Sequence, residues 1–165
     1  MAPRRGGGVL STGGSRYRAG MPSWRDNTPR AVQDDLDSAL SAALDAALNL
    51  LTKNGEFFPF GVTVNDAGQV GLTAADPGLG EHPDSTAVLA SLYAGTSDSR
   101  GAYRAAAFVA DVRANGSDAV LVEAEHRDGG PCLLIVMPYQ RKGLVKKIVT
   151  YGQMTAGPGE HRVWP

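Results

Sequence analysis

The chain has 165 residues, of which 42% are hydrophobic and 20% are charged, and its formal net charge is −1. This length suits one domain, and the balanced charge excludes a strong global field toward nucleic acid or a membrane surface. The only cysteine, Cys132, excludes an internal disulfide and a cysteine-based zinc site, and it favours a reducing, cytoplasmic location. Because no apolar run approaches the ~20 residues of a membrane-spanning helix, we expect no membrane partner.

The N-terminal segment 1–20 is rich in Gly, Ser and Arg and contains few apolar side chains. We expect it to be a disordered basic arm, followed by a single domain over residues 21–165. Met21 is an alternative start of the chain. An arm without a function is favoured over one that contacts nucleic acid or another acidic partner, and nucleic acid is not the partner that we expect.

The firmest secondary-structure prediction is a long helix that starts near residue 28 and ends at Gly55. Thr28 is a favourable N-cap, Pro29 suits the first helical position, and Gly55 suits a left-handed C-cap. Apolar side chains recur at spacings of three and four residues, at Val32, Leu36, Leu40, Leu44, Leu48 and Leu51. This stripe predicts that Leu44 lies buried at the centre of a packed face.

The rest of the chain alternates between strand patterns and turn residues, with one further helix that begins after Asp84 and ends at Gly95. Strands are expected over residues 57–64, 69–74, 103–112, 119–125, 132–137 and 146–154. Short hairpin turns between them favour antiparallel pairing. We therefore predict an α+β fold with the order αββαββββ, in which an antiparallel sheet of about five to six strands carries both helices on one face.

Glu123 and Glu125 are the nearest approach to an acid–base pair. Two residues apart on a strand, they share one face at ~7 Å, a spacing that can hold a metal or divide acid and base roles. In the alternative interpretation this face is solvated and the two carboxylates pair with Lys146 or Lys147 on a neighbouring strand. The solvated face is the favoured interpretation, and we expect neither a metal nor a cofactor.

A second candidate is a basic cluster with interleaved aromatics, formed by Tyr139, Arg141, Lys142, Lys146 and Lys147. Such clusters bind phosphates, although lysines also protect edge strands from pairing with other chains. Cys132 is a third candidate, with His126 as a possible base, but a buried thiol is more often a small apolar side chain.

Four segments carry a resemblance to other proteins: residues 21–29 (MPSWRDNTP), 55–61 (GEFFPFG), 137–139 (MPY) and 151–152 (YG). With the Ala, Gly, Asp and Arg bias they resemble a protein family of high-GC bacteria, and this resemblance implies no activity and assigns no catalytic residue. The order of elements is also similar to that of roadblock and profilin-like modules. That likeness implies a dimerising scaffold, or a partner of small GTPases.

These observations favour a non-catalytic module that dimerises and binds other proteins over an enzyme. The aromatic segment with Phe57, Phe58 and Phe60 offers apolar side chains for an interface, and a homodimer is the expected assembly. The alternative is a small-ligand-binding protein or hydrolase that uses the sheet face with Glu123, Glu125, Lys146 and Lys147.

Overall fold

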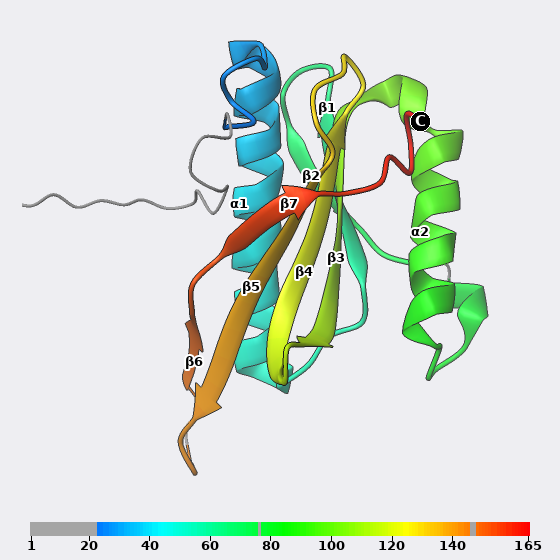
Figure 1. Ribbon diagram of the computed structural model, residues 1–165. Helices are drawn as coiled ribbons and strands as arrows, with labels where there is room; N and C mark the ends of the chain where they lie inside the picture. The colour runs from blue at the N-terminus through cyan, green and yellow to red at the C-terminus, as the bar shows by residue number, and fades with distance from the viewer. Residues whose placement is uncertain (1–22, 76, 146–147) are drawn as a thin grey trace, which may run out of the picture.

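The computed structural model describes residues 23–75, 77–145 and 148–165 and has an antiparallel sheet between two helices (Figure 1). Strands follow the order β2-β1-β3-β4-β5-β6, and β7 pairs with the first half of β5 while β6 pairs with its second half. The α+β class and the antiparallel sheet are confirmed. The structure has one strand that the sequence does not predict, β7, because its residues Thr-Ala-Gly-Pro show no alternation of apolar and polar side chains.

The elements have the following bounds in chain order: α1 Arg30–Asn54, β1 Phe60–Asn65, β2 Val70–Thr73, η1 Pro77–Leu79, α2 Ser85–Asp98, η2 Arg100–Ala102, β3 Tyr103–Ala114, β4 Ser117–His126, β5 Leu133–Lys142, β6 Ile148–Tyr151 and β7 Thr155–Pro158.

The two helices lie on opposite faces of the sheet, so the prediction of both on one face is wrong (Figure 1). Alternate residues of β3 show the arrangement. Ala105, Ala107 and Val109 belong to the core cluster under α1, whereas Ala106 and Phe108 belong to a second cluster with α2. β3 is apolar on both sides, and such a strand is typical of a sheet that is covered on both faces.

Alanines, rather than leucines, form the centre of the buried stripe of α1. Ala39, Ala43 and Ala47 are fully buried and let the helix axis approach the sheet closely. Leu44 is only half-buried, so its predicted place at the centre of the stripe is wrong. A strict spacing of four residues drifts around a helix with 3.6 residues per turn, and the leucine series therefore leaves the contact face.

The ends of α1 follow their predicted chemistry in part. Gly55 has φ +80° and its N–H donates to the carbonyl of Leu51 at 2.8 Å, which confirms the left-handed cap. At the other end Pro29, not Thr28, occupies the N-cap position, and the Thr28 hydroxyl donates to the carbonyl of Trp24 instead.

We predict that Leu36→Ala lowers the free energy of unfolding by about 3 kcal/mol, because the Leu36 side chain of α1 is fully buried in the core between the helix and the sheet. The matched change Leu48→Ala, on a half-buried flank of the same helix, should cost less than about 1 kcal/mol. Urea denaturation measures both values. Equal costs would contradict the assignment of the contact face.

Candidate functional site

Glu125 on β4 is a buried carboxylate that binds the C-terminal segment of the chain, residues 159–165. Its side chain is 1% exposed. Three consecutive backbone N–H groups donate to its oxygens, from Arg162 at 2.6 Å, Val163 at 3.1 Å and Trp164 at 2.9 Å. Consecutive amides that converge on one anion form a nest, and this geometry compensates the cost of burying the charge.

Glu123 extends this attachment from the same face of β4. It accepts hydrogen bonds from the N–H of Glu160 at 3.0 Å and from the Arg162 Nε at 2.9 Å. The Arg162 guanidinium lies 4.9 Å from the centroid of the Tyr93 ring on α2. The C-terminal segment therefore joins β4 to α2 and crosses from β7 toward the helix (Figure 1).

The expectation of a solvated sheet face at Glu123 and Glu125 is wrong, because both side chains are buried. The C-terminal segment approaches so closely that a Cβ at Gly159 would lie 3.0 Å from the Glu123 Oε2. All four carboxylate oxygens accept hydrogen bonds from this segment. Lys146 and Lys147, the expected neighbours, lie outside the described residues.

His126 belongs to a second buried network, which sequence reasoning missed. Its Nδ1 accepts the N–H of Asp128 at 3.0 Å, so the ring proton lies on Nε2, which donates to the Asp35 Oδ2 at 2.9 Å. Arg104 donates to the other oxygen of Asp35 at 2.7 Å. Asp35 is 69 residues from Arg104 and 91 from His126 along the chain, so no local pattern indicates this network.

Both nitrogens of His126 are therefore engaged, and neither can accept a proton from a thiol. Cys132 is buried, and its Sγ donates to the carbonyl of Glu160 at 3.1 Å. Burial, followed by the negative charges of Glu123 and Glu125, raises the pKa of the Cys132 thiol to about 12. A thiol with this pKa stays protonated near neutral pH and is a poor nucleophile.

Three members of the basic cluster are described, Tyr139, Arg141 and Lys142, and they share no common partner. Tyr139 is buried and its hydroxyl donates to the Asp111 Oδ1 at 2.7 Å; burial and this carboxylate raise the pKa of the Tyr139 phenol. Arg141 donates to the carbonyl of Gly55 at 2.6 Å, at the negative end of α1. Lys142 is exposed. These three side chains do not form one phosphate site.

The three phenylalanines after α1 differ in burial. Phe60 belongs to the core, and the half-buried Phe57 ring lies 5.5 Å from it between centroids. Phe58 is 53% exposed. Of the three, it alone is available to a partner.

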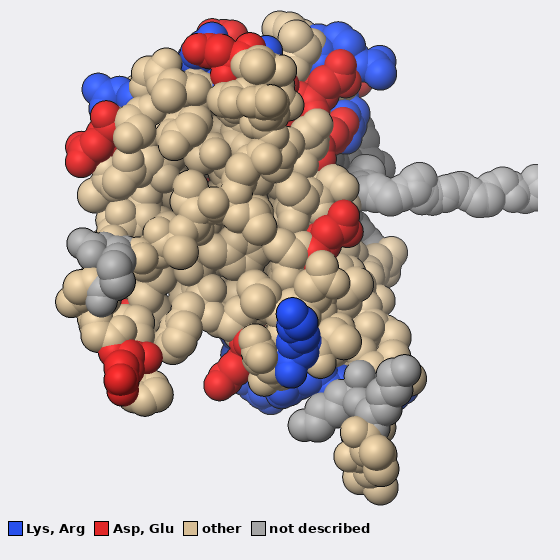
Figure 2. Space-filling model, turned by 180° about the vertical axis from the view of Figure 1, so that it is seen from behind, with Lys and Arg blue, Asp and Glu red and all other residues tan. Residues whose placement is uncertain are grey.

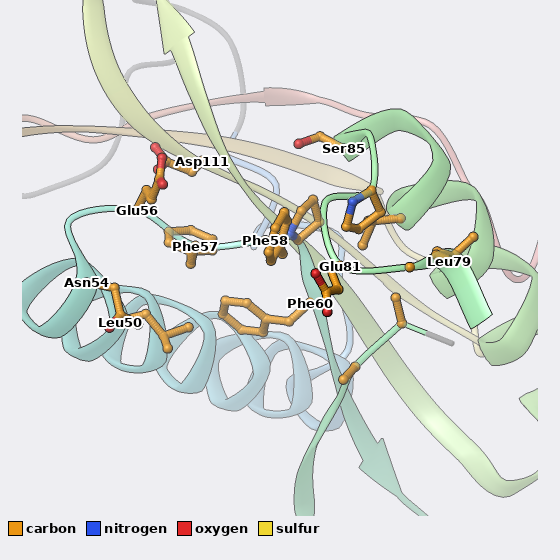
Figure 3. A pocket seen from close by; sticks show the side chains of 16 residues that line it. Leu50, Asn54, Glu56, Phe57, Phe58, Phe60, Leu79, Glu81, Ser85 and Asp111 are labelled. Carbon is orange, nitrogen blue, oxygen red and sulfur yellow. The ribbon is translucent and has the colours of Figure 1, made fainter. Parts of the chain in front are cut away.

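Phe58 lines an open pocket of about 740 Å³, here called the aromatic groove (Figure 3). It lies between the end of α1, residues 56–60, residues 74–75 and 79–83, the start of α2 and Asp111 of β3. Figure 3 shows Phe57, Phe58 and Phe60 on the side of the segment that follows α1, opposite Leu79 and Ser85. The sequence shows the phenylalanines, but not that the distant Leu79 and Glu81 face them across a groove.

The free edge of β2 is a second unoccupied surface. In the described part of the chain β2 pairs only with β1. Val70 and Leu72 on it are 42% and 60% exposed, and the strand contains neither a charged residue nor proline. Figure 2, which views the molecule from behind, shows a broad uncharged surface with the charges gathered at its margins.

Comparisons of the chain with protein-family models, curated proteins and solved structures find no match. Among the residues that the structure describes, no cluster of three or more His, Cys, Asp or Glu side chains is placed to hold a metal ion. The described helices include none with the length and apolar character needed to cross a membrane.

We predict that Glu125→Gln destabilises the fold by about 2 kcal/mol, because the amide nitrogen of Gln cannot accept the N–H groups that the carboxylate binds. Asp98→Asn, at an exposed position of α2, is the matched control and should change stability by less than about 0.5 kcal/mol. Thermal and urea denaturation measure both. An unchanged stability of the Glu125 variant would show that the C-terminal segment is not bound as described.

We also predict that Cys132 resists alkylation by iodoacetamide in the folded protein at about pH 8, where only ~10⁻⁴ of such a thiol is ionised. Unfolding in guanidinium chloride removes burial and the two carboxylates, so the rate should rise at least about 100-fold. Mass spectrometry of timed samples gives both rates. Similar rates in the two states would refute the buried, protonated thiol.

Proposed function

We propose that this chain is a non-catalytic interaction module that associates with a second copy of itself through the free edge of β2. The observation that carries the proposal is the edge itself: an exposed apolar strand without charge or proline. Unpaired N–H and C=O groups on such a strand are a template for pairing, and monomeric proteins usually protect them.

A second copy fits this edge better than a charged partner does. Two β2 strands related by a two-fold axis pair antiparallel, which continues the antiparallel sheet across the dimer. Since β2 carries no charge, self-pairing brings no like charges together. Val70 and Leu72, both exposed in the single chain, would become buried between the copies.

The engaged state of the polar clusters supports a role without catalysis. Hydrogen bonds within the chain already engage the polar side-chain atoms of Glu123, Glu125 and His126. The raised pKa of Cys132 keeps its thiol protonated. A hydrolase that used the Glu123 and Glu125 face would first have to displace the C-terminal segment. The free thiol of Cys132 also suits the cytoplasm, where we place the module.

Light scattering coupled to size-exclusion chromatography tests the assembly at micromolar concentration. The chain has a mass of 17.2 kDa, so we expect about twice this value, ~34 kDa. Leu72→Lys places a charge in the pairing edge of each copy and should give a monomer with an unchanged circular dichroism spectrum.

Leu144→Lys is the matched control, since Leu144 is 99% exposed on the connection between β5 and β6, away from β2. This variant should remain a dimer. A monomeric wild-type chain would overturn the proposal, as would a dimer that survives Leu72→Lys.

A further inference from the structure

We propose that the aromatic groove binds a small organic cation with an apolar body. The groove is a different surface from the pairing edge of β2: neither Val70 nor Leu72 lines it. The proposal therefore goes beyond self-association and does not depend on it. It rests on the composition of the lining and on the volume of the groove.

The lining combines apolar walls with negative charge. Among the sixteen described residues that line the groove, Glu56, Glu81 and Asp111 carry carboxyl groups, and none carries a positive charge. The remaining lining is largely apolar and includes the three phenylalanines, Leu50, Leu79, two prolines and Val88. Aromatic faces beside carboxylates favour organic cations over anions and over neutral molecules of the same shape.

The two glutamates are free to meet a ligand. Glu56 and Glu81 are exposed, and among the described residues neither forms an ion pair. Asp111 is different, because it already accepts the Tyr139 hydroxyl and its pKa is raised, mainly by burial. We therefore assign the main recognition of the positive charge to Glu56 and Glu81, with Asp111 adding negative potential at the groove wall.

Arg141 is a described guanidinium near one wall of the groove, and its positive charge acts to lower the pKa of Asp111. Arg141 is held by the carbonyl of Gly55 and lies 3.9 Å from Asp118, and it is not part of the groove lining. Among the described residues the cation–π contacts involve the rings of Trp24 and Tyr93, and no cation lies over the Phe58 ring. A ligand cation over this ring gains a cation–π contact, and its apolar body covers surface that water now contacts.

The volume indicates a small molecule as the occupant. Pockets for small ligands span about 300–1,000 Å³, and the groove has about 740 Å³. Phe58 and Leu79 are exposed at 53% and 36%, so a compact ligand with one aromatic ring finds apolar surface on opposite walls (Figure 3).

Three probes of similar shape and different charge test the inference: 2-phenylethylamine, 2-phenylethanol and phenylacetate. We expect the amine to bind in a titration followed by ¹H–¹⁵N NMR, with shifts concentrated at the backbone amides of the non-proline residues within 56–60 and 79–85. The alcohol should bind at least about tenfold more weakly, and phenylacetate should not bind, because the carboxylates repel it.

Variants then separate charge recognition from apolar contact. Glu81→Gln should weaken the amine several-fold and leave the alcohol unchanged, whereas Phe58→Ala should weaken both. Asp98→Asn removes the same charge from an exposed position outside the groove and should change neither. The proposal is overturned if no probe binds at millimolar concentration, if the amine binds no better than the alcohol, or if the shifts fall outside the groove.

Discussion

The buried carboxylate of Glu125 is the constraint on which much of this structure depends. Placing a charge in the interior is costly, and three backbone N–H groups of the C-terminal segment offset that cost. The same contact places Val163 in the apolar cluster with α2 and Arg162 over the ring of Tyr93. One side chain of the sheet thus holds the C-terminal segment, which in turn contacts α2 through Val163 and Arg162.

Because the buried acidic side chains stabilise the fold, they are not available to bind a ligand or a substrate. Glu125 holds the C-terminal segment, and Asp35 holds α1 to β3 and β4 through Arg104 and His126. Side chains that resemble acid–base machinery in the sequence therefore stabilise the fold. Two mainly apolar surfaces are left unoccupied in the described chain, the edge of β2 and the aromatic groove, and the proposed roles are accordingly association and ligand binding.

Local patterns predicted the elements well and their arrangement only in part. The short hairpin turns expected from the sequence include the one between β3 and β4, where Asn115 and Gly116 tolerate positive φ and adopt φ 52° and 80°. The opposite placement of the helices was not visible, because β3 is apolar on both faces. The burial of Glu123 and Glu125 was missed because their partners lie 37 to 39 residues away in a segment with no periodic pattern. The groove was missed because it combines segments that are adjacent only in the folded chain.

Native-state hydrogen exchange at the amides of Arg162, Val163 and Trp164 tests the central claim most directly. If Glu125 binds these three N–H groups in the folded state, they should exchange as slowly as amides of the central strand β4, such as that of Val122, and exchange faster in Glu125→Gln. Exchange at the rate of an unprotected peptide in the wild-type chain would contradict the account, because the C-terminal segment would then be free of the sheet.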